Sequence, residues 1–222
     1  MFERNAIALL EEWAGRDDRK PLILRGARQV GKTTLVQSFS KSFDTYLYLN
    51  MEDEGAVQLF EMRGTMESLI SSIFLYCNKA RGKGKTLLFI DEIQYSPKAV
   101  AKLRYFYEEA SYIHVIAAGS LLESLIDTHI SFPVGRVEYM AIRPCSFNEF
   151  LGALGETELE KALRTADIPE ALHSRTMDLF NTYTLIGGMP EVVNHYAKNK
   201  DLVSINRIYE TLLSGYKDDV EK

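Results

Sequence analysis

Short apolar runs alternate with longer amphipathic segments over the first two thirds of the chain. Most of these runs are continuously apolar, which is typical of strands that are covered on both faces of a sheet. The segments between them repeat their apolar residues at helical spacing. This alternation predicts a three-layer α/β domain with a parallel sheet of five strands. The expected strands are Pro21–Arg25, Tyr46–Leu49, Leu87–Ile90, Ile113–Ala118 and Val137–Ile142, and the expected helices include Lys32–Lys41, Met66–Lys79 and Lys98–Ala110.

The pattern changes after Pro144. Ser146 precedes Glu149 by three residues, the spacing of a capping box, and this predicts the start of a helix. From there onward every segment has helical spacing, and the last one carries an apolar stripe from Leu202 to Tyr216. We therefore expect two domains, one at residues 1–150 and a helical one at residues 151–222.

Composition agrees with a globular protein. The chain has 222 residues, of which 46% are hydrophobic and 26% charged, and these values exclude a disordered chain, a collagen-like fibre and a disulfide scaffold. No apolar run approaches the ~20 residues that span a bilayer, and no secretory signal is visible. Cys77 and Cys145 are far apart, as expected of reduced thiols. We therefore expect a cytoplasmic protein without membrane contact. The net charge of −5 does not favour nucleic acid as a partner, and that alternative stays open.

Residues 26–33 fit the pattern G-x-x-x-x-G-K-[ST] between a predicted strand and a predicted helix. Gly26 and Gly31 permit the backbone to wrap around a phosphate, so that its N–H groups surround the anion. We expect Lys32 to bridge the β- and γ-phosphates and the Thr33 hydroxyl to ligate Mg²⁺. The expected phosphate-binding set is Gly26, Ala27, Arg28, Gln29, Val30, Gly31, Lys32, Thr33 and Thr34, in which Thr34 reaches the α-phosphate and the side chains of Arg28 and Gln29 point outwards.

Two carboxylates follow the predicted strand at Leu87–Ile90. The carboxyl end of a parallel strand faces the ligand crevice, so Asp91 is suited to support Mg²⁺. Glu92 is suited to polarise the water that attacks the γ-phosphate. A glutamate directly after the aspartate favours hydrolysis over phosphoryl transfer to a small molecule. Gln94 either contacts the nucleotide or only ends the strand.

Ser120 and Arg136 each have two interpretations. Ser120 follows a strand that can lie between the other two, and it either approaches the attacking water or caps the next helix. Arg136 precedes the fifth strand, and it either stabilises γ-phosphate charge, within the subunit or across an interface, or is a surface arginine. His114 lies inside a predicted strand and is expected to be a packed residue.

Six segments of the chain carry a family resemblance, at residues 25–35, 89–94, 118–122, 135–136, 143–151 and 187–193. Together they resemble a known group, the AAA-type ATPases related to the archaeal ATPase group. This resemblance implies an additional-strand P-loop fold, ATP as the nucleotide, Asp91 and Glu92 as the hydrolytic pair, and Ser120 as a sensor-like residue. It also implies a helical region after residue 150, and whether this region is winged-helix-like stays open. Members usually continue into a nuclease-like C-terminal domain, so we expect the chain to be cut short.

These features favour a Mg²⁺-dependent ATP hydrolase. In this hypothesis, binding and hydrolysis drive a conformational switch that the helical region relays, and a homo-oligomer or a protein partner completes the activity. A second hypothesis is a nucleotide-binding interaction module with little hydrolysis. A third is a DNA-associated ATPase whose helices after residue 150 contact DNA.

Overall fold

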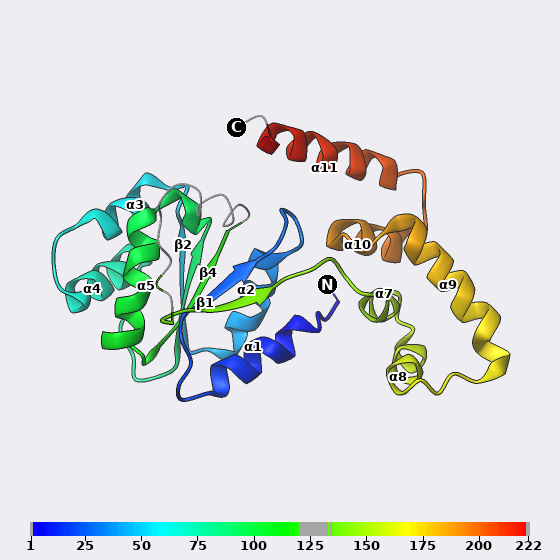
Figure 1. Cartoon of the computed structure of the whole chain (residues 1–222), viewed down its shortest axis with the longest axis horizontal. Coiled ribbons are helices and arrows are strands. Elements are labelled where there is room, and N and C mark those ends of the chain that lie inside the picture. Colours follow the sequence, from blue (N-terminus) through cyan, green and yellow to red (C-terminus); the bar gives the residue numbers. More distant parts are fainter. Residues whose placement is uncertain (1, 120–132, 134, 221–222) are drawn as a thin grey trace. The chain divides into compact units, whose positions relative to one another are not determined.

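The structure, a computed structural model, describes residues 2–119, 133 and 135–220 (Figure 1). The chain divides into two compact units. The sheet unit comprises the described residues of Ala6–Ala27 and Lys32–Ile142, and the helical unit comprises those of Met1–Asn5, Arg28–Gly31 and Arg143–Lys222. The division therefore follows Ile142, whereas the sequence predicts a boundary at residue 150. It also assigns four residues of the expected phosphate loop to the helical unit.

Five parallel strands form the sheet, as predicted, in the order β2-β3-β4-β1-β5. Because β4 lies between β3 and β1, the sheet has the additional-strand arrangement. The expected strands all occur with bounds within one residue of those predicted. They are β1 (Leu22–Arg25), β2 (Thr45–Asn50), β3 (Thr86–Asp91), β4 (Ile113–Ala118) and β5 (Glu138–Ala141).

Helices cover both faces of the sheet (Figure 1). Helices α1 (Ala6–Gly15) and α2 (Lys32–Phe39) contact each other on one face, and α3 (Glu54–Glu61), α4 (Met66–Tyr76) and α5 (Pro97–Glu109) contact one another on the other face. Short 3₁₀ turns follow α2 and β3, at Ser40–Ser42 and Ile93–Tyr95. Among the described residues, no helix is long and apolar enough to cross a membrane.

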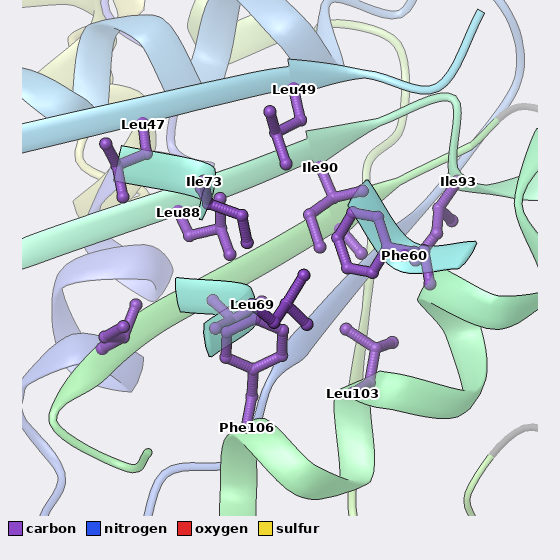
Figure 2. Close-up of a cluster of buried hydrophobic side chains, with 14 of the residues drawn as sticks. Leu47, Leu49, Phe60, Leu69, Ile73, Leu88, Ile90, Ile93, Leu103 and Phe106 are labelled. Carbon is purple, nitrogen blue, oxygen red and sulfur yellow. The ribbon is translucent and has the colours of Figure 1, made fainter. Parts of the chain in front are cut away.

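The largest hydrophobic core lies between the sheet and the helices α3, α4 and α5. Figure 2 shows side chains of β2 and β3 facing side chains that these helices and the turn after β3 contribute. Burial of this apolar surface is the main free energy that holds the strands in register. The labelled members are Leu47, Leu49, Leu88 and Ile90 from the strands and Phe60, Leu69, Ile73, Ile93, Leu103 and Phe106 from the opposite layer.

The helical unit is built of α7 to α11 around a second core that includes Phe150, Ile186, Val192 and Val193. The predicted capping box is confirmed, because the Ser146 side chain accepts from the Glu149 N–H and the Glu149 carboxylate accepts from the Ser146 N–H. Residues 143–220 contain helices and no strand, so the expected helical region is confirmed, and these residues form no wing. The helices are α7 (Phe147–Leu154), α8 (Thr157–Thr165), α9 (His173–Ile186), α10 (Pro190–Asn199) and α11 (Ile205–Val220), with a 3₁₀ turn at Glu170–Leu172.

Two of the segments that carry the family resemblance meet inside this unit. The Cys145 N–H donates to the Gly188 carbonyl at 2.6 Å, and the Tyr183 hydroxyl donates to the Cys145 carbonyl at 2.8 Å. A Cβ atom at Gly188 would lie 2.3 Å from the Cys145 carbonyl oxygen. Glycine is therefore required at position 188 by the close approach of two backbone segments.

We expect Gly188→Ala to lower the free energy of unfolding by about 2 kcal/mol or more, because the added methyl group overlaps the backbone of Cys145. Gly215→Ala is the matched control. Gly215 lies inside α11 with no neighbouring atom within 4 Å of its added Cβ, so its substitution should stabilise by up to ~1 kcal/mol. Urea unfolding followed by circular dichroism checks both values. Equal stability of the two variants would contradict the close approach.

His114 is buried on β4, as predicted for a packed residue. Its ring makes edge contacts with Trp13 and Phe43, and its Nε2 lies 3.3 Å from the Ala14 carbonyl oxygen. Burial, together with the positive charge of Arg19, lowers the pKa of His114 to about 4. The folded sheet unit therefore holds this imidazole in its neutral form.

Because the pKa of His114 is lower in the folded chain than in the unfolded chain, its stabilising effect is complete above pH 6.5 and is lost as the pH falls toward 4. We expect the free energy of unfolding of the wild type, relative to His114→Phe, to fall by about 2 kcal/mol between pH 7 and pH 5. Urea titrations of both proteins at the two pH values measure it. A difference that is independent of pH would contradict the burial of a neutral His114.

Candidate functional site

The loop that joins β1 to α2 contains the predicted phosphate-binding pattern. Three of its residues have positive φ, which are Gly26 (φ 151°), Gln29 (φ 62°) and Gly31 (φ 87°). Where residues of positive φ stand among residues of negative φ, the backbone curls and its N–H groups gather on the concave side. This is the geometry that binds anions. At Gly31 the positive φ, rather than a lack of space, makes a residue with a Cβ atom unfavourable.

Lys32 is the first residue of α2 and is buried. Its ammonium group donates to the carbonyl oxygens of Gly26 at 2.8 Å and Ala27 at 2.9 Å. These contacts hold the Lys32 charge at the start of the loop. They can be exchanged for phosphate oxygens, which are stronger acceptors because they carry negative charge.

Thr33 and Asp91 come together at the carboxyl edge of the sheet. The Thr33 hydroxyl donates to the Asp91 carboxylate at 2.7 Å, although 58 positions separate the two residues. Burial raises the pKa of Asp91, and hydrogen bonds from Thr33 and from the Glu92 N–H oppose this shift. Both side chains offer hard oxygen donors, the type that Mg²⁺ prefers, so they fit a magnesium ion that also binds phosphate.

Glu92 follows β3 in a left-handed conformation, with φ 49° and ψ 43°. This conformation costs a residue with a Cβ atom roughly 1–3 kcal/mol, and such strain is concentrated at functional sites. The Gln94 amide Nε2 donates to the Glu92 carboxylate at 2.5 Å. Gln94, whose role the sequence leaves open, therefore holds the half-buried Glu92 side chain in place.

Tyr48 is a site residue that the sequence does not indicate. It is on β2, and its hydroxyl lies 3.5 Å from the Asp91 carboxylate. Burial raises the pKa of Tyr48, and the Asp91 charge adds to the shift. The signal is the alternation of tyrosines with buried leucines along the edge strand β2, which becomes informative once β2 is paired with β3.

The remaining predicted residues are placed as follows. Thr34 and Gln29 are exposed, and Arg28 is half-buried. Arg136 precedes β5 and pairs with Glu108 at 2.9 Å, at the amino edge of the sheet and thus opposite the edge with the loop. The sheet unit therefore does not bring Arg136 to Lys32. Ser120 lies outside the described residues.

The comparison with known families decides the classification. The family model of an AAA domain matches residues 18–151, more than half of the chain. The chain belongs to the AAA domain family. The match covers β1 to β5 together with the loop, Asp91 and Glu92. Membership supports nucleotide binding by this AAA domain, as the sequence motifs predict.

A solved structure shows the same fold, and two further matches have lower TM-scores. A Walker-type ATPase of Pyrococcus abyssi is similar to all of this chain over 76% of its own length, with a TM-score of 0.63 and 16% identity. PCH-2 of C. elegans matches 88% of this AAA domain chain over 60% of its own length, with a TM-score of 0.42 and 16% identity. The ORC1 protein of Aeropyrum pernix, solved in complex with DNA, matches 72% over 50% of its own length, with a TM-score of 0.43 and 15% identity. No curated protein sequence matches the chain.

Proposed function

We propose that this AAA domain protein binds and hydrolyses ATP with Mg²⁺. The observation that carries the proposal is the hydrogen bond between Thr33 and Asp91. It brings the hydroxyl that follows the loop lysine to the carboxylate that ends β3, and this is the pairing that a metal ion bound to a nucleotide requires. The family match supports the same chemistry.

In the proposed reaction, the N–H groups of the loop and the start of α2 bind the phosphates. Lys32 leaves the carbonyls of Gly26 and Ala27 and bridges the β- and γ-phosphates. Thr33 and Asp91 would hold Mg²⁺, which, when bound, neutralises charge that develops on the phosphate oxygens. Glu92 orients a water molecule in line with the γ-phosphate and accepts its proton.

Completion of this site by a second protomer or by a protein partner is part of the proposal. Arg136 is exposed on the sheet unit, where it pairs with Glu108. The nucleotide of an adjacent protomer would replace Glu108 as its partner. ATP turnover per protomer would then rise with protein concentration, and Arg136→Ala would remove this rise. Hydrolysis would drive a conformational switch in the helical unit.

We expect Lys32→Ala to abolish ATP binding, because it removes the cation that the phosphates replace at the loop. Glu92→Gln should retain binding and lose turnover by a factor of roughly 10²–10⁴, since an amide cannot accept the proton. Calorimetry with Mg-ATP and a phosphate-release assay measure the two effects. Lys98→Ala and Glu61→Gln, which break an exposed ion pair elsewhere on the sheet unit, are matched controls.

Three results would contradict the proposal in different ways. Unchanged turnover in Glu92→Gln would show that another group is the base. Tight ATP binding without turnover at any protein concentration would favour the interaction module. Salt-dependent DNA binding that ATP modulates would favour the DNA-associated ATPase.

We expect Gln94→Glu to lower turnover at unchanged ATP affinity. A second carboxylate repels the Glu92 carboxylate, to which the Gln94 amide donates in the wild type, and so displaces it. Gln94→Ala should lower turnover by roughly tenfold at unchanged ATP affinity, because the Glu92 carboxylate loses its orientation. Gln37→Ala, an exposed glutamine on α2, is the control. If both Gln94 variants keep the wild-type rate, Gln94 does not position Glu92.

A further inference from the structure

Arg4 belongs to no motif, yet its guanidinium group contacts three segments of the helical unit. Its Nε donates to the Glu149 carboxylate at 2.9 Å, its Nη1 to the Val30 carbonyl at 3.1 Å, and its Nη2 to the Arg143 carbonyl at 2.7 Å. Val30 is within the phosphate-binding pattern and Arg143 is the first residue after the sheet unit. One side chain therefore joins the loop to the start of the helical region.

Tyr216 makes a second contact of the same kind. Its hydroxyl, on α11, donates to the Arg28 carbonyl at 3.1 Å. Arg28 and Val30 are alternate residues of the loop. Thus two alternate loop carbonyls are fixed by side chains that are far from the loop in the sequence.

The fixed carbonyls determine where the neighbouring N–H groups point. In a trans peptide the C=O and the following N–H are coplanar and antiparallel, and the described residues contain no cis peptide. A bond from Tyr216 to the Arg28 carbonyl therefore directs the Gln29 N–H away from Tyr216. By the same geometry, the bond from Arg4 to the Val30 carbonyl directs the Gly31 N–H away from Arg4.

These two N–H groups belong to two of the three loop residues whose φ is positive, Gln29 and Gly31. Their left-handed conformation turns the N–H groups to the concave side of the loop, where an anion binds. The strained conformation of Gln29 needs support from its surroundings. Arg4 and Tyr216 provide this support through the carbonyls.

Glu149 fixes Arg4 in turn. Its carboxylate is buried and accepts from Arg4, from the Asn5 N–H at 2.8 Å and from the Ser146 N–H at 2.7 Å. Burial acts to raise the pKa of Glu149, but these hydrogen bonds outweigh it and lower the pKa, so the carboxylate stays ionised. The negative charge of Glu149 compensates the positive charge of Arg4. Arg4 therefore acts on the loop by geometry rather than by attraction of phosphate.

We propose that Arg4 is a positioning residue for nucleotide binding and that, with Tyr216, it couples the helical unit to the phosphate loop. The inference rests on the proposed function, because it concerns the same loop. Arg4 and Tyr216 hold the loop in its anion-binding form before the nucleotide arrives. Nucleotide binding must then strengthen the contacts of Arg4 and Tyr216 by the same factor, because coupling is reciprocal.

Calorimetric titration with Mg-ADP, at a temperature well below the melting point of each protein, tests the proposal. One lost hydrogen bond corresponds to about fivefold in affinity. We expect Arg4→Ala to weaken ADP binding by about tenfold or more, and Tyr216→Phe by about fivefold. Arg4→Lys should lie between the wild type and Arg4→Ala, since an ammonium group cannot match three separated acceptors. Arg175→Ala, which breaks an exposed ion pair with Glu156, and Tyr112→Phe, at an exposed tyrosine, should change affinity by less than about twofold.

Hydrogen exchange separates positioning from general stability. In the wild type, ADP should slow exchange of the Asn5 and Glu149 amides, and this protection should be absent from Arg4→Ala. Folded Arg4→Ala and Tyr216→Phe that bind ADP as tightly as the wild type would overturn the inference. If Arg4→Ala does not fold, Tyr216→Phe decides, because it removes a single hydroxyl group. A wild type that binds no nucleotide would overturn the proposed function itself, and the inference with it.

Discussion

The candidate site depends on the hydrogen bond between Thr33 and Asp91. Strands in a sheet are about 4.8 Å apart, so β1 and β3, with β4 between them, are separated by roughly 10 Å. The first turn of α2 spans this separation and brings the Thr33 hydroxyl within 2.7 Å of the Asp91 carboxylate. Any change of strand order or register would separate the loop from Asp91. The chemistry therefore depends on the packing that fixes the sheet.

That packing also maintains groups that are unfavourable on their own. Lys32 and Asp91 are charged and buried, and Glu92 has a left-handed backbone. Each costs free energy relative to an exposed, relaxed residue. The cost is tolerable because β3 is buried along its whole length between layers of apolar side chains. A nucleotide with its metal would offset part of it, which is why such groups are concentrated at binding sites.

Local patterns made much of this predictable. The five strands, the loop between β1 and α2 and the capping box at Ser146 are each encoded within about ten neighbouring residues, and the structure has them where the sequence predicts. The assignment of residues 28–31 to the helical unit has no local signal, because it depends on contacts between distant segments. The same reason hides the pairing of Arg4 with Glu149, which are 145 residues apart. An arginine before the first helix gives no local sign of its partner.

The division of the loop extends this argument from the fold to the proposed function. Gly26, Ala27, Lys32 and Thr33 belong to the sheet unit, whereas residues 28–31 belong to the helical unit. The residues that offer a cation and a hydroxyl are thus fixed by β1, α2 and β3. The backbone groups at the tip of the loop are fixed by Arg4 and Tyr216. A rearrangement within the helical unit that moved either side chain would alter the tip directly, with no change in the sheet. Regulation of nucleotide affinity by the helical unit then needs only two hydrogen bonds, each worth about 1 kcal/mol.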